Sequence, residues 1–207
     1  MLGAIFSRRD EKKALTDPEL AASARAGSAD AFRELVRRFE RPIYSLIFRM
    51  VQDHSTAEDL AQEVFVKAYR KLETYDPSRK LSSWLFKIAH NTTIDHLRRG
   101  GVETVPLEAA RDGDDGAGLS AVLPDEGVES PAAAAERRDL AKSLERAIGR
   151  LRPEYRESVL LFYLHGASYQ EICEATGLPL GTVKTNLHRA RKQLAQEMTS
   201  MGWGPEA

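Results

Sequence analysis

Aromatic and cationic side chains alternate along one stretch near the middle of the chain, and this combination suits the binding of unstacked nucleic-acid bases. The aromatic members are Tyr69, Tyr75, Trp84 and Phe86. The residues that follow supply cations, imidazole and an amide, namely Lys87, His90, Asn91, Arg98 and Arg99. Rings can stack on bases, cations can bind phosphates, and the amide can hydrogen-bond a base edge. Because the same spacing also suits an ordinary helical core, these residues alone leave single-strand binding open.

A second candidate site lies in residues 168–195, whose layout is that of a helix-turn-helix. A capping-box pattern at Ser168 and Glu171 begins a short helix, Gly177 supplies the turn, and a longer amphipathic helix follows. The outer face of that longer helix carries Thr182, Lys184, Thr185, His188, Arg189, Arg191 and Lys192. Four cations and no acid lie between Pro179 and Gln196. Since a solvated helix face ordinarily mixes both signs of charge, this pattern predicts that the helix binds duplex DNA.

The elements that must position these residues are all predicted to be helices. Apolar residues recur at helical spacing through residues 17–99 and 136–197, and no segment alternates with period two long enough to predict a strand. Thr16–Glu19 and Ser55–Glu58 have the composition of capping boxes, and Ser82 or Ser83 is expected to cap the helix that ends near residue 99. Pro42 is expected to kink or break its helix. The predicted fold class is therefore all-α, with two small helical domains.

A compositional change separates the two helical blocks. Residues 100–135 carry 1 basic and 8 acidic side chains, whereas residues 1–99 carry 18 and 14, and residues 136–207 carry 11 and 9. The glycines, prolines and acids of residues 100–135 predict a mobile acidic linker. The formal net charge of −1 thus conceals two mildly basic blocks, for which two small cores are expected rather than one. Residues 1–16 and 198–207 are an N-terminal extension and a tail with no assigned role.

Composition excludes several classes of protein. A single cysteine, Cys173, cannot form an internal disulfide, and apolar runs such as Val159–Leu164 are too short to span a membrane. The N-terminus lacks the order of charges of a secretory signal, so a cytoplasmic location is predicted. The five histidines lack metal-ligand spacing, and the chain carries neither a glycine-rich phosphate loop nor a nucleophile motif. The sequence therefore predicts a protein that is not an enzyme and that holds no metal or cofactor.

Both candidate sites resemble conserved regions of bacterial sigma factors. The resemblance to the second region is carried by Asp59–Tyr69, Ser83–Asn91 and Ile94–Arg99, and the resemblance to the fourth by Ser168–Ile172, Gly181–Lys184 and Arg189–Arg191. The extracytoplasmic-function (ECF) group has only these two regions joined by a linker, which is the layout found here. The resemblance implies a region 2-like domain over residues 17–99, a linker over residues 100–135 and a region 4-like helix-turn-helix domain over residues 136–197.

The resemblance also implies a function: a sigma factor that binds core RNA polymerase, directs promoter-specific initiation and aids promoter melting. It assigns core-polymerase binding to Asp59, Gln62, Glu63, Val66 and Tyr69. It assigns the minus-ten element to Tyr75, Trp84, Phe86, Lys87, His90, Asn91, Arg98 and Arg99, with Phe86 and Asn91 at the family's base pocket. It assigns the minus-thirty-five element to Ser168, Gly181, Thr182, Lys184, Thr185, His188, Arg189, Arg191 and Lys192.

The partners implied are core polymerase, promoter DNA as duplex and as melted non-template strand, and an anti-sigma factor. The acidic linker would occupy the RNA exit path of the polymerase. Because Lys184, Asn186 and His188 depart from residues common in relatives, the resemblance does not extend to the promoter sequence.

Two other functions compete with this one. A stand-alone helix-turn-helix regulator would bind duplex DNA as a dimer, but the chain lacks the sustained heptads that a dimerisation surface of that kind needs. An inhibitory protein that binds polymerase or a sigma factor without contacting DNA would leave the acid-free helix face unexplained.

Overall fold

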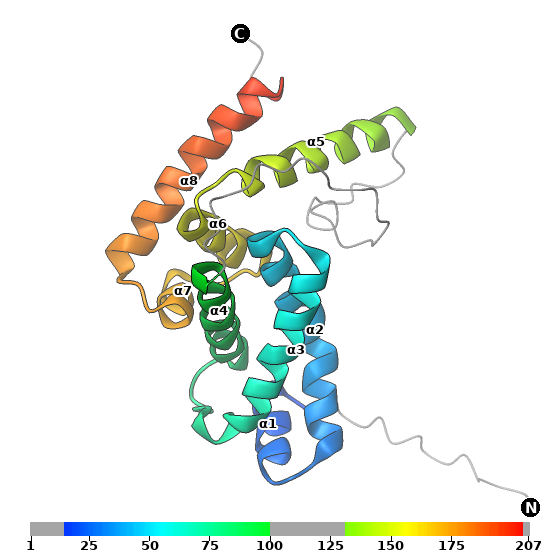
Figure 1. The fold of residues 1–207 in the computed structure, drawn as a ribbon, viewed down its shortest axis with the longest axis vertical. Helices are drawn as coiled ribbons and strands as arrows, with labels where there is room; N and C mark the ends of the chain where they lie inside the picture. Colours follow the sequence, from blue (N-terminus) through cyan, green and yellow to red (C-terminus); the bar gives the residue numbers. More distant parts are fainter. Residues whose placement is uncertain (1–14, 100–130, 205–207) are drawn as a thin grey trace, which may run out of the picture.

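The computed structural model describes residues 15–99 and 131–204, and every regular element in those ranges is a helix (Figure 1). The first range holds α1 (Asp17–Arg25), α2 (Ala29–Val51), α3 (His54–Arg70), the short 3-10 turn η1 (Leu72–Thr74) and α4 (Leu81–Arg99). The second holds α5 (Pro131–Gly149), α6 (Pro153–Val159), the π-helical turn η3 (Leu160–Leu164), α7 (Tyr169–Thr176) and α8 (Leu180–Ser200). The predicted acidic linker, up to residue 130, and most of the predicted N-terminal extension lie outside the described residues.

Side-chain caps begin most of the helices in the first range. The Thr16–Glu19 capping box is confirmed, with the Thr16 backbone N–H donating to Glu19 Oε2 at 2.7 Å. The predicted cap of α3 at Ser55 is wrong, because Asp53 accepts from the Thr56 backbone N–H at 2.7 Å and begins the helix earlier. The hydrogen bond from the Thr56 hydroxyl, together with this one from the Thr56 backbone N–H, lowers the pKa of the Asp53 carboxyl. The prediction for α4 is also wrong, since that helix begins at Leu81 and places both candidate serines in its first turn.

Pro42 lies inside α2, which continues through it, so the expectation of a broken helix is wrong. A proline removes one backbone donor and crowds the preceding turn, a cost of about 3 kcal/mol. Apolar side chains on both sides of Pro42 are buried on one face of α2, including Leu35, Ile43 and Ile47. Burying each such side chain is worth roughly 1.5–3 kcal/mol. The packing of both halves of α2 against one core therefore outweighs the local penalty.

The second range forms the predicted helix-turn-helix with two supporting helices. The Ser168 capping box is confirmed at the start of α7, and Gly177 ends α7 in the left-handed conformation with φ of 74°, which allows the abrupt turn into α8. Helices α5 and α6 pack against α8 (Figure 1). Helix α5 begins at Pro131, five residues before the predicted domain start at residue 136.

The buried apolar side chains of the two domains form one continuous cluster, which runs from Leu20 in α1 to Ala190 in α8. The prediction of two separate cores is wrong for this arrangement, because α4 packs against α7 and α2 against α6 (Figure 1). Each domain therefore completes its core partly with side chains of the other. None of the helices in the two described ranges is long and apolar enough to cross a membrane.

Candidate nucleic-acid and polymerase interfaces

One face of α3 carries exposed apolar side chains among polar ones. Val66 is 49% and Tyr69 58% exposed, although both are large hydrophobic residues. The other predicted polymerase-binding residues, Asp59, Gln62 and Glu63, are exposed beside them. On the opposite side of α3, Leu60, Val64 and Ala68 are buried, as the sequence predicts. The amphipathic pattern therefore leaves a mixed polar and apolar surface of the kind that protein partners cover.

Contacts across the surface of α2 and α3 hold this face in place. The Tyr69 ring meets the Phe32 ring of α2 edge-on, with centroids 4.9 Å apart. Glu63 pairs with Lys67 one turn further along α3 at 2.7 Å, and the Lys67 ammonium also donates to Thr92 Oγ1 of α4 at 3.1 Å. The exposed part of Tyr69 is thus oriented by its neighbours before any partner binds.

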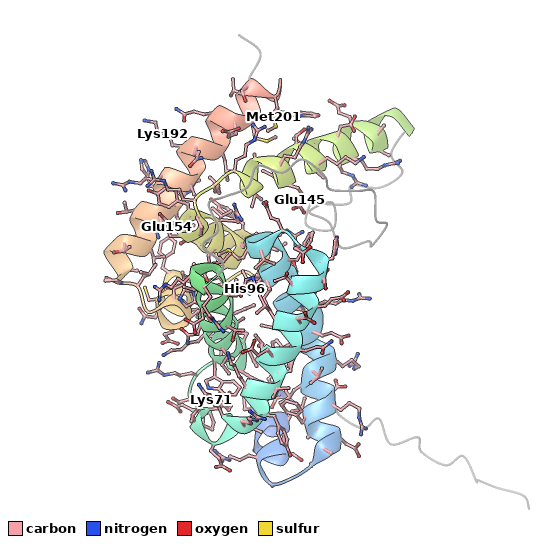
Figure 2. The ribbon with its side chains drawn as sticks, in the orientation of Figure 1. Lys71, His96, Glu145, Glu154, Lys192 and Met201 are labelled. Atoms are coloured by element: carbon pink, nitrogen blue, oxygen red, sulfur yellow. The ribbon has the colours of Figure 1, made fainter. Side chains whose placement is uncertain are left out.

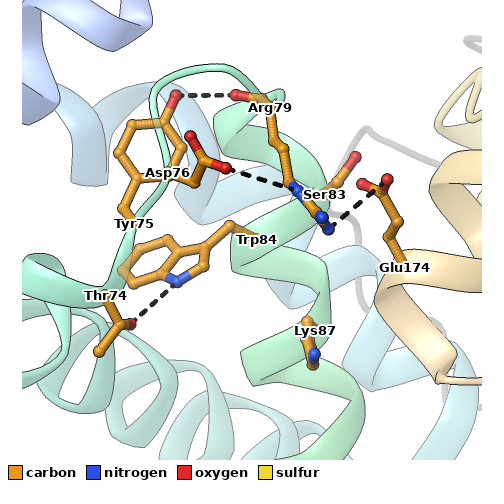
Figure 3. A pocket seen from close by; sticks show the side chains of 8 residues that line it. All are labelled: Thr74, Tyr75, Asp76, Arg79, Ser83, Trp84, Lys87 and Glu174. Atoms are coloured by element: carbon orange, nitrogen blue, oxygen red, sulfur yellow. Dashed lines mark hydrogen bonds and ion pairs between the residues drawn. The ribbon is translucent and has the colours of Figure 1, made fainter.

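A pocket of about 220 Å³ lies between the loop after η1 and the start of α4 (Figure 3). It is lined by Thr74, Tyr75, Asp76, Arg79, Ser83, Trp84, Lys87 and Glu174. The Tyr75 and Trp84 rings lie 5.7 Å apart, and the Trp84 indole N–H donates to Thr74 Oγ1 at 3.4 Å. The partly exposed Trp84 ring offers a surface on which a base can stack, with two cations nearby.

The loop that forms one wall of this pocket is fixed by its own hydrogen bonds. Tyr75 is buried, its hydroxyl donates to the Arg79 carbonyl at 2.9 Å, and burial raises the pKa of its phenol. Asp76 Oδ1 accepts from the Ser78 backbone N–H at 2.9 Å, and the hydrogen bonds from Ser78 lower the pKa of the Asp76 carboxyl. The loop is therefore a preformed wall, and Tyr75 supports the pocket from behind instead of offering a free ring.

The predicted minus-ten residues separate into three groups. Tyr75, Trp84 and Lys87 line the pocket, while Asn91, Arg98 and Arg99 are exposed further along α4. Phe86 and His90 instead face the second domain. The buried Phe86 ring lies 4.9 Å from the His165 ring, and His90 Nδ1 lies 2.6 Å from Glu157 Oε1. In this arrangement Phe86 and His90 are covered by protein.

Several pocket residues were missed by the sequence analysis. Thr74, Asp76, Arg79 and Ser83 are close in sequence to predicted members, and the loop composition was a usable signal for them. Glu174 belongs to the other domain, and no local pattern could have placed it here.

The predicted duplex-binding face of α8 is exposed along its length. Its members Thr182, Lys184, Thr185, His188, Arg189, Arg191 and Lys192 are all exposed. Lys192 projects from the side of α8 that faces away from α5 (Figure 2). Gly181 is exposed in the first turn with open space around it, and Ser168 caps α7 nearby. Asn186 is turned inward and buried, so it does not belong to this face.

The structure shows no cluster of three or more metal-ligating side chains within residues 15–99 and 131–204.

Comparison with known protein families places both domains. Residues 35–102 match the family described as Sigma-70 region 2, and residues 141–194 match Sigma-70, region 4. The chain is 35% identical over 175 residues to the ECF RNA polymerase sigma factor SigW of Bacillus subtilis strain 168, which covers 84% of this chain and 92% of that protein. It is 30% identical over 184 residues to the ECF RNA polymerase sigma-E factor of Escherichia coli K12, covering 87% and 93%.

Solved structures show the same fold. CnrH, in complex with the cytosolic domain of CnrY, superimposes with a TM-score of 0.61 at 26% identity, covering 89% of this chain and 97% of that chain. The sigma factor RpoE of Bartonella quintana, in complex with the anti-sigma factor NepR, superimposes with a TM-score of 0.61 at 22% identity, covering 81% and 96%.

Proposed function

Because the chain belongs to the ECF family of RNA polymerase sigma factors, we propose that it binds bacterial core RNA polymerase through α3 and directs initiation by contacting two promoter elements. The pocket and α4 bind the melted non-template strand of the minus-ten element. Helix α8 enters the major groove of the minus-thirty-five element. The polymerisation chemistry belongs to the polymerase, and this chain supplies positioning and strand capture in the cytoplasm.

The observation that carries this proposal is the acid-free, exposed face of α8. All of its predicted DNA-binding side chains are exposed, whereas Val183, Leu187 and Ala190 on the opposite side are buried. Short polar side chains in the first turn suit base edges, and the cations further along suit phosphates. A helix whose role was only structural would not need its acids excluded from one face.

The Trp84 pocket accounts for promoter melting. Taking a base out of a duplex costs a few kcal/mol, and stacking that base on an aromatic side chain returns about 1–3 kcal/mol. Lys87 and Arg79 at the pocket supply positive charge for the phosphates that accompany the base. The pocket thus offsets part of the cost of melting without any chemical step.

The solved relatives also support a protein partner. CnrH is in complex with the cytosolic domain of CnrY, and the RpoE structure holds the anti-sigma factor NepR. We propose that this chain too is bound by an anti-sigma factor.

Run-off transcription with core RNA polymerase and a pool of genomic promoter fragments tests the function directly. Discrete transcripts that appear only when this chain is added would support a sigma factor and identify its promoters. Duplex binding without polymerase, and no new transcripts, would contradict the proposal and favour a stand-alone regulator. Loss of transcripts that another sigma factor directs would favour an inhibitory interaction protein.

Two substitutions separate polymerase binding from strand capture. Asn91→Ala is expected to leave polymerase affinity unchanged and to lower the transcript yield from a cognate promoter. The reason is that the loss of one good base contact weakens promoter binding by about 1–3 kcal/mol. Val66→Asp places a charge on the exposed apolar part of α3 and is expected to weaken polymerase binding itself. Polymerase affinity and transcript yield are measured for both variants. Equal loss of both quantities in Asn91→Ala would contradict its assignment to the DNA surface.

Lys184→Ala tests the duplex-binding face of α8. The loss of one phosphate contact is expected to weaken binding of the holoenzyme to promoter duplex and to reduce the slope of log affinity against log salt by about 1. Lys142→Ala is the matched control, because Lys142 is an exposed cation on α5, away from this face. Unchanged affinity at several salt concentrations in Lys184→Ala, or an equal effect in both variants, would exclude Lys184 from the interface.

A further inference from the structure

Polar contacts join one flank of α8 to the corner between α5 and α6, residues 150–155, where α6 packs against α8 (Figure 1). Asn186 Nδ2 donates to the Glu154 carbonyl at 3.5 Å. Arg189 Nη1 donates to the Tyr155 hydroxyl at 3.3 Å. Since the two α8 residues are three positions apart, they lie on the same side of the helix.

The same contacts continue towards the C-terminal end of α8. Gln193 Nε2 donates to the Arg150 carbonyl at 3.4 Å, and Glu197 Oε2 pairs with the Arg150 guanidinium at 2.8 Å. With the two residues above, they recur every three or four positions, which is the spacing of one side of an α-helix. The four α8 residues, which we call the corner row, are Asn186, Arg189, Gln193 and Glu197.

The corner row fixes the rotation of α8 about its own axis. The buried side of the helix, with Val183, Leu187 and Ala190, is held by apolar contacts, which have no directional preference. Hydrogen bonds weaken steeply when their angle is distorted, so the corner row opposes a rotation that apolar packing alone would permit. Because a binding surface works only when its side chains are held within about 10–20° of the productive geometry, this rotation also determines where the duplex-binding side chains point.

Arg189 belongs both to the corner row and to the predicted duplex-binding face, where it is exposed. A guanidinium carries five N–H donors, so the bond to Tyr155 leaves four of them for a phosphate. The Tyr155 ring is half-buried against the core and has few rotatable bonds, so its hydroxyl is a fixed point. Holding a long side chain in place before binding avoids an entropy cost that corresponds to about two- to tenfold in affinity.

We propose that Tyr155 is a positioning residue for duplex binding, because its hydroxyl holds the Arg189 guanidinium towards the DNA backbone before the duplex arrives. This inference rests on the proposed function, since it concerns how α8 contacts the duplex. Tyr155 lies in α6, 34 positions before Arg189 and outside the helix-turn-helix itself. The other members of the corner row keep the rotation of α8 at which Arg189 and the neighbouring cations reach phosphates together.

A duplex pool of random sequence tests this role without reference to any promoter. The full-length chain is titrated into the fluorescent pool at low salt, and anisotropy measures the affinity. Tyr155→Phe keeps the ring and removes only the hydroxyl, and it is expected to weaken binding about two- to tenfold. Because no charge is lost, the slope of log affinity against log salt is expected to stay unchanged, whereas Arg189→Ala is expected to reduce that slope by about 1.

A double-mutant cycle shows whether Tyr155 acts through Arg189. If its hydroxyl orients the guanidinium, Tyr155→Phe causes no further loss of affinity in a chain that already carries Arg189→Ala. A purely structural role of Tyr155, or a direct contact of its hydroxyl with DNA, gives the same fold loss in both backgrounds, and that result would overturn the proposal. Unchanged affinity in either single variant would overturn it as well.

The matched control is Tyr163→Phe, because Tyr163 is a tyrosine of the same domain that is 50% exposed. This variant is expected to bind the pool as tightly as the wild type, and an equal loss in both tyrosine variants would overturn the proposal. Circular dichroism verifies that the helices of every variant are intact. Failure of the proposed function shows itself separately, as absent promoter transcripts in a chain whose duplex binding follows the expected cycle.

Discussion

Replacement of Arg156 by methionine is expected to lower the free energy of unfolding by about 3–4 kcal/mol. Arg156 is 4% exposed, and its guanidinium donates to five backbone carbonyls at the boundary of the two domains. These carbonyls belong to Arg49 and Met50 at the end of α2, and to Ile148, Gly149 and Leu151 at and after the end of α5. The last carbonyls of a helix lack partners within the helix and carry partial negative charge.

The cost follows from what methionine leaves behind. A buried acceptor that loses its donor costs about 1–3 kcal/mol, and hydrogen bonds to a charged donor are the stronger ones. Burial lowers the pKa of Arg156 to about 10, which still leaves the guanidinium charged at neutral pH. Methionine fills much of the same volume, so the expected loss reports the hydrogen bonds more than a cavity.

Urea unfolding at neutral pH measures this loss. Arg152→Met is the matched control, since Arg152 is an exposed arginine only four residues away. Arg156→Lys keeps the charge but not the fork of donors, so it should fall between the wild type and Arg156→Met. An Arg156→Met protein within about 0.5 kcal/mol of the wild type would show that the carbonyls are satisfied in another way.

Stability is expected to fall by about 2–3 kcal/mol as the pH drops from 6.5 to 4, because of His165 alone. Burial, and to a smaller extent the charge of Arg49, lower the pKa of His165 to about 4. Its Nε2 is enclosed without a hydrogen-bond partner, and its ring packs on Phe86. Between these pH values the unfolded chain binds a proton that the folded chain excludes. The unfolded state is therefore stabilised relative to the folded state as the pH falls, and the free energy of unfolding decreases.

The His165→Phe variant isolates this effect, because phenylalanine keeps a ring against Phe86 and cannot titrate. Its free energy of unfolding should change by about 2–3 kcal/mol less than that of the wild type between pH 6.5 and 4. His188→Gln is the control, since His188 is exposed on α8. Parallel pH profiles for the wild type and His165→Phe would contradict the prediction.

Carboxylates contribute in a different pH window. The pKa values of the carboxyls of Asp53 and Asp76 are lowered by hydrogen bonds from Thr56 and Ser78 respectively. The stability that a lowered carboxyl pKa provides is fully present well above the unfolded value near 4 and is lost as the pH falls through that value towards the folded one. Because these carboxyls are the same in the wild type and in His165→Phe, the difference between the two pH profiles isolates the contribution of His165.

Arg156 and His165 lie on the same boundary between the domains. Arg156 joins α6 to the end of α2, and His165 packs on α4. Unfolding experiments on these residues therefore report the contact between the two domains as well as the fold of each.

Local signals in the sequence correctly predicted the helices and the face that each one buries. The capping boxes at Thr16 and Ser168 and the apolar stripe of α3 depend on residues within one or two turns of each other. The exposed faces of α3 and α8 follow from the same periodicity, because a helix that buries one side must present the other. Predictions failed where packing decided, as at Pro42, and where one capping residue competed with another, as at Asp53.

The sequence by itself determined the all-α class, the two domains and the chemical character of the candidate DNA- and polymerase-binding faces, because periodicity and charge pattern are local properties. Only the tertiary structure decided that both domains share one core and that Phe86 and His90 are covered. It alone placed Glu174 beside Trp84 and Arg156 at the end of α2. These contacts join residues about 70 to 110 positions apart, and their energy depends on how helix faces meet in space, which no local pattern encodes.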